Sequence, residues 1–276
     1  MSAPDPYDTS VTAIEDPALA FRRWRAWSDA SRADPRLQRD LQYGPSEAET
    51  LDLLVPRPGA PLVVFFHGGY WRRLHKDDHT FIARSLAAHG AATAVVNYAL
   101  VPDVTIEDIV AQARRAVAWL RKNAASFGAD PTRLVVAGHS VGGQLAGMCA
   151  VEAPVTAIVT LSGLHDLRPL MESHVQAWAQ LDDARAAAMS PSLQAPSSSF
   201  PVVAIAGERE SSAFAWQAGE LVRAWSAHGC TGTSATSPGD DHFTLVDRLN
   251  DPDDPLVSQI AQLALGDDTQ PVRNTI

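Results

Sequence analysis

The sequence predicts an α/β fold in which helices cover both faces of a mainly parallel β-sheet. From about residue 48 onward, short apolar runs alternate with segments of helical periodicity, as in successive strand–helix–strand units. The central runs are rich in Val, Ile and Phe and lack polar alternation, which is typical of parallel strands buried on both faces. A chain of 276 residues suits one domain of this class.

Seven segments are predicted to be strands because they are short and most of them are apolar, with turn residues between them. They are Thr50–Val55, Leu62–Phe66, Thr93–Tyr98, Leu134–Gly138, Ala157–Leu161, Val202–Ala206 and Thr231–Ser237. Between them, Asp77–Asp78 can cap a helix that runs to His89, and Thr105 can cap a longer one. The longer helix has an apolar face made of Ile109, Ala113, Ala116, Val117 and Leu120.

We expect a single domain over residues 1–276, with two additions to the sheet and its helices. Residues 1–45 predict a helical lead-in that packs on the domain. Residues 163–195 lie between two predicted strands and have a helix-like pattern, so they predict a small cap.

The composition disfavours several classes of function. The formal net charge is −10 and basic residues form no cluster beyond short pairs, so nucleic acid and anionic membranes are poor partners. Two cysteines, Cys149 and Cys230, make neither a disulfide framework nor a thiolate metal cluster. The first residues lack a secretory signal, and no apolar run reaches the roughly 18 residues of a membrane span. These features predict a cytoplasmic protein.

The segment Gly138-His139-Ser140-Val141-Gly142 matches G-x-S-x-G, the pattern of a nucleophilic serine on a sharp turn. A predicted strand precedes it and a helix-like segment follows, which is the context that the pattern requires. Ser140 is therefore the predicted nucleophile, and the N–H of Val141 is a predicted oxyanion donor.

A second pattern, His67-Gly68-Gly69-Tyr70-Trp71, directly follows the strand Leu62–Phe66. A hydrolase with a serine turn needs another oxyanion donor in the loop after this strand. Gly68 and Gly69 allow the backbone to approach the reacting group without side-chain obstruction, so they are predicted to complete the oxyanion hole. An ordinary Gly-Gly turn is the alternative interpretation.

His242, in Asp240-Asp241-His242-Phe243, follows the last predicted strand and is the predicted general base. Three carboxylates could orient it: Glu208, Glu210 and Asp166. Glu210 lies further into its loop than Glu208, and the spacing favours it. His75 and His79 lack the glutamate of H-E-x-x-H, so no metal or other cofactor is expected.

These segments resemble the kynurenine formamidases (arylformamidases) of the α/β-hydrolase fold. His67–Trp71 reads HGGYW and Gly138–Gly143 reads GHSVGG; HGGYW is the specific part, because most esterases of this fold carry HGGG or HGGA there. The resemblance spans roughly residues 7–250. It continues through Tyr43-Gly44, Leu161–Pro169, Gly207–Phe214 and Gly239–Phe243.

The resemblance implies an α/β-hydrolase fold with a small helical cap, and hydrolysis of N-formyl-L-kynurenine to kynurenine and formate in tryptophan catabolism. The family acid is usually Asp, three residues after the glycine that ends its strand, which falls on Glu210 here. The chain also differs from the family at Val141, where Ala is usual, and at His165, where Tyr is usual.

On the substrate side, Tyr70 and Trp71 can pack on an aryl ring or can simply support the loop. His165 and His174, in the cap, can touch substrate, although surface positions are more usual. The alternatives are a small-ester carboxylesterase, or a formamidase for another aryl-formamide in secondary metabolism. From another class, the alternative is a binding protein on a hydrolase fold. The expected partner is a small molecule, and a homodimer is left open.

Overall fold

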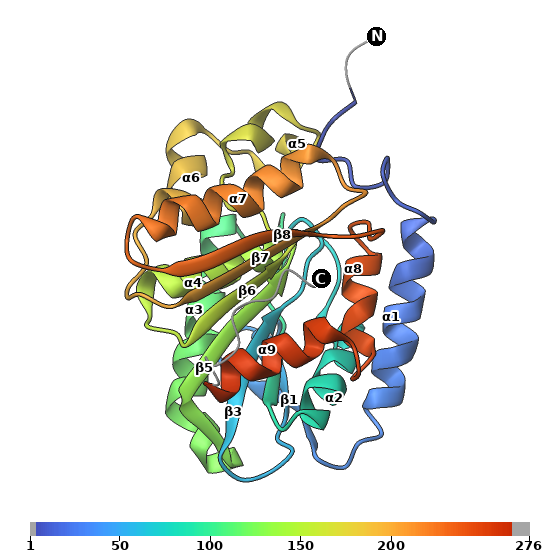
Figure 1. Ribbon diagram of the computed structural model, residues 1–276, viewed down its shortest axis with the longest axis vertical. Helices are drawn as coiled ribbons and strands as arrows, with labels where there is room; N and C mark the ends of the chain where they lie inside the picture. Colours follow the sequence, from blue (N-terminus) through green and yellow to red (C-terminus); the bar gives the residue numbers. More distant parts are fainter. Residues whose placement is uncertain (1–3, 267–276) are drawn as a thin grey trace.

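The computed structural model describes residues 4–266, and a mixed eight-stranded sheet forms the centre of that part (Figure 1). The strands lie in the order β1-β2-β4-β3-β5-β6-β7-β8. β2 pairs antiparallel with both β1 and β4, and the other neighbours are parallel. The strands are β1 (Leu37–Gln42), β2 (Thr50–Leu54), β3 (Ala60–Phe66), β4 (Ala92–Val96), β5 (Ala129–His139), β6 (Ala157–Leu161), β7 (Pro201–Gly207) and β8 (Thr231–Ser237).

Helices pack on both faces of this sheet (Figure 1). They are α1 (Pro17–Ser31), α2 (Phe81–Ala88), α3 (Ile106–Asn123), α4 (Val141–Glu152), α5 (Gln176–Ala179), α6 (Asp183–Ala188), α7 (Ser212–Ser226), α8 (Thr244–Asp247) and α9 (Pro255–Leu265). Short 3₁₀ helices are η1 (Lys76–Asp78), η2 (Ala124–Phe127), η3 (Arg168–Glu172), η4 (Pro191–Leu193) and η5 (Arg248–Asn250).

The side chains of β3 pack alternately into the cores on the two faces of the sheet. Leu62, Val64 and Phe66 pack into one core with α3, α4 and α7, whereas Val63 and Phe65 pack into the other with α1, α2 and α9. Every residue of β3 is buried. The uninterrupted apolar sequence of this strand follows, because neither face of a central parallel strand meets water.

The chain order creates a crevice at the carboxyl ends of β3 and β5. β3 connects through α2 to β4 on one side of it, and β5 connects through α4 to β6 on the other side. The connections therefore diverge between these two neighbouring strands. In open α/β sheets, ligands bind outside the carboxyl ends of the strands at such a point.

The predicted fold class and strands are confirmed, and two local predictions are wrong. Residues 37–42 were expected within a helical lead-in but form β1, which pairs with β2 at the sheet edge. Within the described part of the lead-in, the helix is α1 alone. The helix expected to begin at Asp77–Asp78 begins at Phe81 instead, because these aspartates lie in η1, which His75 caps. Thr105 does cap α3, through a hydrogen bond to the N–H of Asp108.

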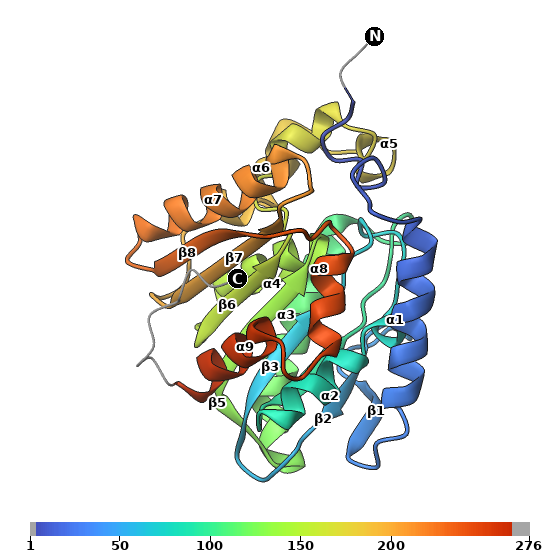
Figure 2. The same cartoon turned by 45° about the vertical axis from the view of Figure 1, so that its right-hand side comes forward.

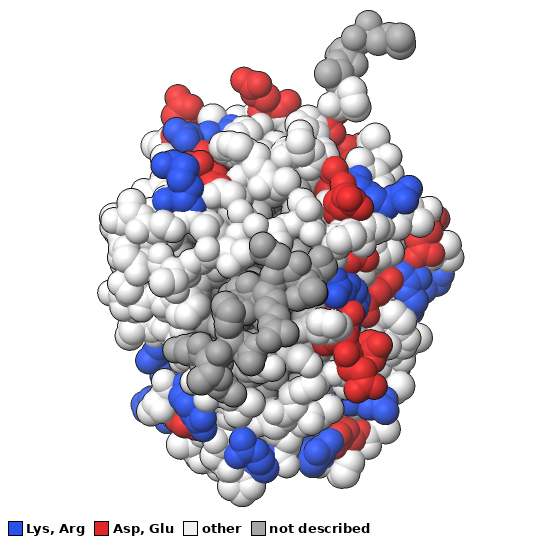
Figure 3. All heavy atoms as spheres, in the orientation of Figure 1, with Lys and Arg blue, Asp and Glu red and all other residues white. Residues whose placement is uncertain are grey.

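The surface carries mixed charge. On the face shown in Figure 3, Lys and Arg side chains lie in small separate groups, many of them beside Asp or Glu. The ion pairs of the described residues include those of Arg223 with Glu220 and of Arg248 with Asp254. Across residues 4–266, no helix combines the length and the apolar character needed to cross a bilayer.

Candidate active site

Ser140 lies on the sharp turn between β5 and α4. Its backbone has φ 56° and ψ −123°, a conformation that costs free energy in a residue with a Cβ and that typically occurs at functional sites. An ideal Cβ on Gly142 would lie 2.0 Å from the carbonyl oxygen of Phe66. Glycine at 142 therefore allows the turn to pack directly against the end of β3.

The loop His67–Trp71 runs beside Ser140. An ideal Cβ on Gly68 would lie 3.1 Å from the Cβ of Ser140, and Gly69 has φ +109°. Among residues 4–266, the N–H groups of Gly68, Gly69 and Val141 have no protein acceptor. These three N–H groups are therefore free to donate hydrogen bonds to a ligand.

His242 contacts one of the three candidate carboxylates. Its Nδ1 lies 2.8 Å from Oε2 of Glu210, and both side chains are buried. The other oxygen of Glu210 accepts hydrogen bonds from the N–H of Gly207, at 2.7 Å, and from the hydroxyl of Ser162. A carboxylate held at both oxygens can fix the imidazole so that Nδ1 donates and Nε2 is left to accept a proton.

The two other candidate acids have different partners. Asp166 pairs with the guanidinium of Arg168 at 2.6 Å. Glu208 accepts a hydrogen bond from the N–H of Gly239 at 2.9 Å. Of the three carboxylates that the sequence left open, Glu210 is the one in contact with His242.

His139 and Asp241 form hydrogen bonds that position the loop of His242. Neither residue was given a role from the sequence. His139 Nε2 lies 2.9 Å from the carbonyl oxygen of His242, and the two rings are 4.5 Å apart. Burial lowers the pKa of His139 well below its usual range, so the neutral ring donates through Nε2. Asp241 accepts hydrogen bonds from the N–H groups of Phe243 and Thr244, each at 2.8 Å. The loop that carries His242 is therefore fixed on both sides of it.

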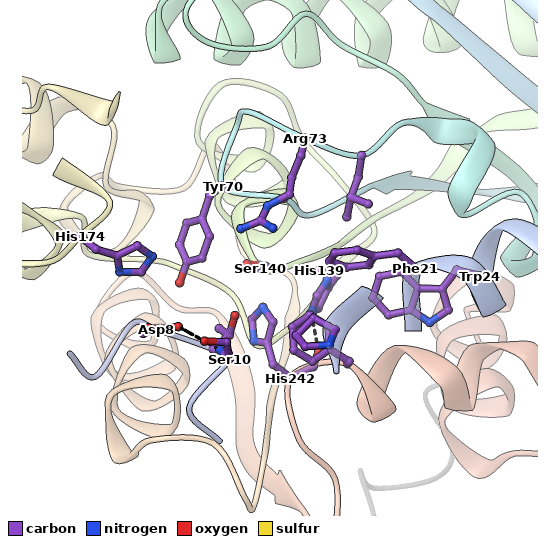
Figure 4. Close-up of a pocket in the computed structure, with 15 residues that line it drawn as sticks. Asp8, Ser10, Phe21, Trp24, Tyr70, Arg73, His139, Ser140, His174 and His242 are labelled. Atoms are coloured by element: carbon purple, nitrogen blue, oxygen red, sulfur yellow. Dashed lines mark hydrogen bonds between the residues drawn. The ribbon is translucent and has the colours of Figure 1, made fainter. Parts of the chain in front are cut away.

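Ser140 and His242 line the same cavity, which has a volume of about 350 Å³ (Figure 4). No hydrogen bond joins the Ser140 hydroxyl to His242 in the described chain, and such contacts are often long until substrate binds. One part of the lining is apolar and comprises Pro17, Phe21, Trp24, Leu74 and Phe243. The other part is polar and comprises Asp8, Thr9, Ser10, Tyr70, Arg73 and His174.

Residues 5–14, here named the N-terminal strap, form one wall of this cavity. The hydroxyl of Tyr70 donates to the carbonyl of Tyr7 at 2.6 Å. At one end of the strap, Asp5 accepts hydrogen bonds from the backbone N–H and the ring of His174. Figure 2 shows the N-terminal segment passing beside the part of the chain that contains α5. At the other end, the N–H of Ile14 donates to Asp241. The strap thus connects residues 163–195, the HGGYW loop and the loop of His242.

Of the four residues considered for contact with substrate, Tyr70 and His174 line the cavity, and Trp71 and His165 do not. Tyr70 lines it, whereas Trp71 is fully buried in the core with its indole N–H 3.3 Å from Oε1 of Gln144. His165 is also fully buried, with its Nε2 3.1 Å from the hydroxyl of Thr160. The cap residue in the cavity wall is His174.

The histidines considered as metal ligands have structural contacts. His75 accepts a hydrogen bond from the N–H of Asp77, and the ring of His79 is fully buried beside those of Trp24 and His67. Burial lowers the pKa of His79 to about 4, so this ring is neutral. Residues 4–266 contain no cluster of three or more His, Cys, Asp or Glu arranged to hold a metal ion.

Sequence reasoning did not find the strap residues of the wall or Arg73. Arg73 follows the HGGYW motif by two residues, and this proximity is the one signal that could have indicated it. Asp8, Thr9 and Ser10 lie in a polar segment without a motif. Their position depends on contacts with distant parts of the chain, which no local pattern encodes.

Comparison with known proteins finds relatives among formamidases and esterases. The kynurenine formamidase of Danio rerio is 28% identical over 267 residues, covering 91% of this chain and 86% of the fish protein. A carboxylesterase of Mycobacterium tuberculosis is 37% identical over 97 residues, covering 35% of this chain and 30% of the esterase. A crystal structure from Silicibacter sp. TM1040, described as a candidate thioesterase, superposes with a TM-score of 0.80 at 30% identity. It covers 92% of this chain and 97% of its own.

Structures at lower identity share the fold. An esterase from Pyrobaculum calidifontis superposes with a TM-score of 0.72 at 20% identity, covering 94% of this chain and 97% of its own. The family model of the alpha/beta hydrolase fold matches residues 63–213, more than half of the chain. The matched segment begins in β3 and includes the HGGYW loop, the Ser140 turn and Glu210. The chain belongs to the α/β-hydrolase fold family, and it is a hydrolase.

Proposed function

We propose that this hydrolase is a serine enzyme that cleaves arylformamides, with N-formyl-L-kynurenine as its substrate. One observation supports the serine mechanism most strongly: His242, which lines the same cavity as a serine on a strained turn, has its Nδ1 2.8 Å from Glu210 Oε2. The likeness to a kynurenine formamidase over 91% of this chain supports the substrate.

In the proposed reaction, the hydroxyl oxygen of Ser140 attacks the formyl carbon while its proton passes to Nε2 of His242. The N–H groups of Gly68, Gly69 and Val141 stabilise the oxyanion that forms. His242 then gives the proton to the anilide nitrogen, the C–N bond breaks, and kynurenine leaves. Water, deprotonated by His242, hydrolyses the formyl ester of Ser140 and releases formate.

The cavity suits a substrate of this kind. Its volume of about 350 Å³ lies at the lower end of the roughly 300–1,000 Å³ of small-ligand sites. Phe21 and Phe243 form part of the apolar lining and can pack on an aryl ring. A formyl group is the smallest acyl group, so it needs little room beside Ser140, which is 1% exposed.

The test is to compare kcat/KM for N-formyl-L-kynurenine with kcat/KM for p-nitrophenyl acetate. We expect kynurenine and formate in equal amounts, and the higher kcat/KM with the formamide. Rapid hydrolysis of the acetate without any turnover of N-formyl-L-kynurenine would instead favour the second candidate function, a small-ester carboxylesterase. The 37% identity to a mycobacterial carboxylesterase over 97 residues is the observation that favours this second candidate.

A further inference from the structure

The cavity contains two opposite charges that have no ion-pair partner among residues 4–266. Asp8 lies on the N-terminal strap, and Arg73 lies just after the HGGYW motif. The Asp8 oxygen Oδ1 accepts hydrogen bonds from the N–H and the hydroxyl of Ser10. The ion pairs of the described chain include neither Asp8 nor Arg73, so the two side chains do not neutralise each other across the cavity.

Figure 4 shows the guanidinium of Arg73 directed into the cavity toward Ser140, with Asp8 and Ser10 on the opposite side. The neighbouring Arg72 differs, because its guanidinium lies 4.4 Å from the ring centre of Trp178 and is not part of the cavity lining. Arg73, an exposed side chain that lines the cavity, thus provides positive charge there in a protein whose net charge is −10.

We propose that Arg73 and Asp8 bind the carboxylate and the ammonium group of an α-amino acid moiety on the substrate. The planar guanidinium can donate two parallel hydrogen bonds to a carboxylate, which is the geometry that arginine provides and lysine does not. The Asp8 oxygen Oδ2 has no hydrogen-bond donor in the described chain and can accept from an ammonium group.

The apolar and the charged residues that line the cavity indicate which kind of ligand it binds. Phe21 and Trp24 lie on one side of Ser140 in Figure 4, whereas Asp8 lies on the other side with Tyr70 and His174. A ligand that fills both parts has an aryl group at one end and a zwitterionic group at the other. The inference rests on the proposed function, since N-formyl-L-kynurenine has this form, and it adds that the zwitterion determines substrate preference.

The first test measures ligand binding by inhibition, so it does not depend on formamide hydrolysis. L-Kynurenine and 2-aminoacetophenone, which lacks the amino acid group, are compared as competitive inhibitors of p-nitrophenyl acetate hydrolysis. In Arg73→Gln, the inhibition constant of kynurenine should rise roughly tenfold relative to that of 2-aminoacetophenone, as expected for a charge-assisted hydrogen bond partly open to solvent. Arg73→Lys should recover part of this ratio, and Arg72→Gln should leave it unchanged.

The second test separates the two charges. Asp8→Asn should weaken inhibition by L-kynurenine roughly tenfold, while inhibition by the analogue without the α-amino group should change less than twofold. Asp29→Asn is the matched control, because Asp29 is an exposed carboxylate on α1. An Arg73→Gln variant that loses affinity equally for both inhibitors, or an Asp8→Asn variant that does not distinguish the analogues, overturns the inference.

Failure of the proposed function gives a different experimental result from failure of the charge inference. If the wild-type protein hydrolyses p-nitrophenyl acetate but not N-formyl-L-kynurenine, the proposed formamidase activity is wrong. The kynurenine inhibition ratios then still decide whether the cavity binds a zwitterion. Equal inhibition of the wild-type protein by kynurenine and 2-aminoacetophenone overturns the charge inference, even where formamide turnover is fast.

Discussion

The floor and the wall of the cavity are built in different ways. The floor is defined here as Ser140 and His242, which line the cavity, together with Glu210, which contacts His242. These residues lie in the loops that follow β5, β8 and β7. The wall is the N-terminal strap, which has no regular secondary structure and is held by side-chain hydrogen bonds to distant residues. The floor therefore takes its geometry from the sheet, and the wall takes its geometry from long-range contacts.

This difference leads us to expect that the floor carries out the reaction and that the wall determines substrate selectivity. Each residue of the floor is 9% exposed or less and follows the carboxyl end of a strand of the sheet, which keeps it within the small tolerance that proton transfer requires. The wall carries partly exposed polar groups such as Asp8, which can be exchanged without disturbing the sheet. Changes in the floor should thus alter kcat, and changes in the wall should mainly alter KM.

The largest effect is expected for Ser140→Ala, which removes the proposed nucleophile. Hydrolysis of both N-formyl-L-kynurenine and p-nitrophenyl acetate should fall by about 10⁵–10⁶ in kcat, as for a group that acts as a unit with its base. A serine-directed fluorophosphonate should label the wild-type protein at Ser140, as detected by mass spectrometry. Wild-type turnover in the variant would show that the floor is not the reaction centre.

Glu210→Gln should lower kcat by up to about 10⁴, because the amide cannot stabilise the imidazolium of His242. KM should remain close to the wild-type value. Glu208→Gln and Asp166→Asn are matched controls and should be far milder, since Glu208 caps a turn and Asp166 pairs with Arg168. If one of these controls loses kcat while Glu210→Gln does not, the acid has been assigned to the wrong carboxylate.

Ser162→Ala tests the hydrogen bond that positions Glu210. Its hydroxyl donates to Glu210, and loss of this hydrogen bond to a charged group should lower kcat roughly 10- to 100-fold. Ser226→Ala is the control, because its hydroxyl donates to the carbonyl of Val222 on an exposed part of α7. Equal effects of the two substitutions on kcat would argue against a positioning role for Ser162.

Tyr70→Phe tests the wall. Burial raises the pKa of Tyr70 well above its usual range, so its hydroxyl stays protonated and donates to the carbonyl of Tyr7. Without that bond the strap should loosen, and KM for N-formyl-L-kynurenine should rise about three- to tenfold while kcat changes less than twofold. Steady-state kinetics decides this, and a fall in kcat at constant KM would place Tyr70 with the floor instead.

The smallest effect is expected from removal of metal ions. The proposed reaction uses side chains and backbone N–H groups in both regions, so prolonged dialysis against a strong chelator should leave kcat and KM unchanged. Activity that disappears and returns on addition of zinc would contradict the proposed mechanism. His75 and His79 would then be the first residues to substitute.

The sequence predicted most of the sheet, because its central strands are apolar throughout and glycine marks its functional turns. β1 was missed since Leu37–Gln42 reads LQRDLQ, in which polar residues outnumber the two leucines, as an edge strand open to water allows. Trp71 was considered for the substrate site because it adjoins Tyr70. Both residues have positive φ, yet the loop sends one side chain to the core and the other to the cavity.

The spacing of the motif favoured Glu210 among three candidate acids, but the sequence did not predict that the strap forms a wall of the cavity. Gln217 contacts the hydroxyl of Tyr7, and Ile14 contacts Asp241, across more than 200 residues of sequence in each case. No local periodicity or turn signal encodes such a pairing. These contacts are made by polar side chains and backbone N–H groups, so the pattern of hydrophobic residues does not indicate them either.

The connection between Ile14 and Asp241 also sets an order of events during synthesis. A ribosome makes Ile14 of the strap 227 residues before its partner Asp241 in the loop of His242. β3 to β6 can pair while synthesis continues, but the wall cannot close over the cavity until β8 has left the ribosome. A nascent chain would therefore hold Ser140 on its turn before it has either a base or an enclosed binding site. We therefore expect hydrolysis only after the loop of His242 has been synthesised.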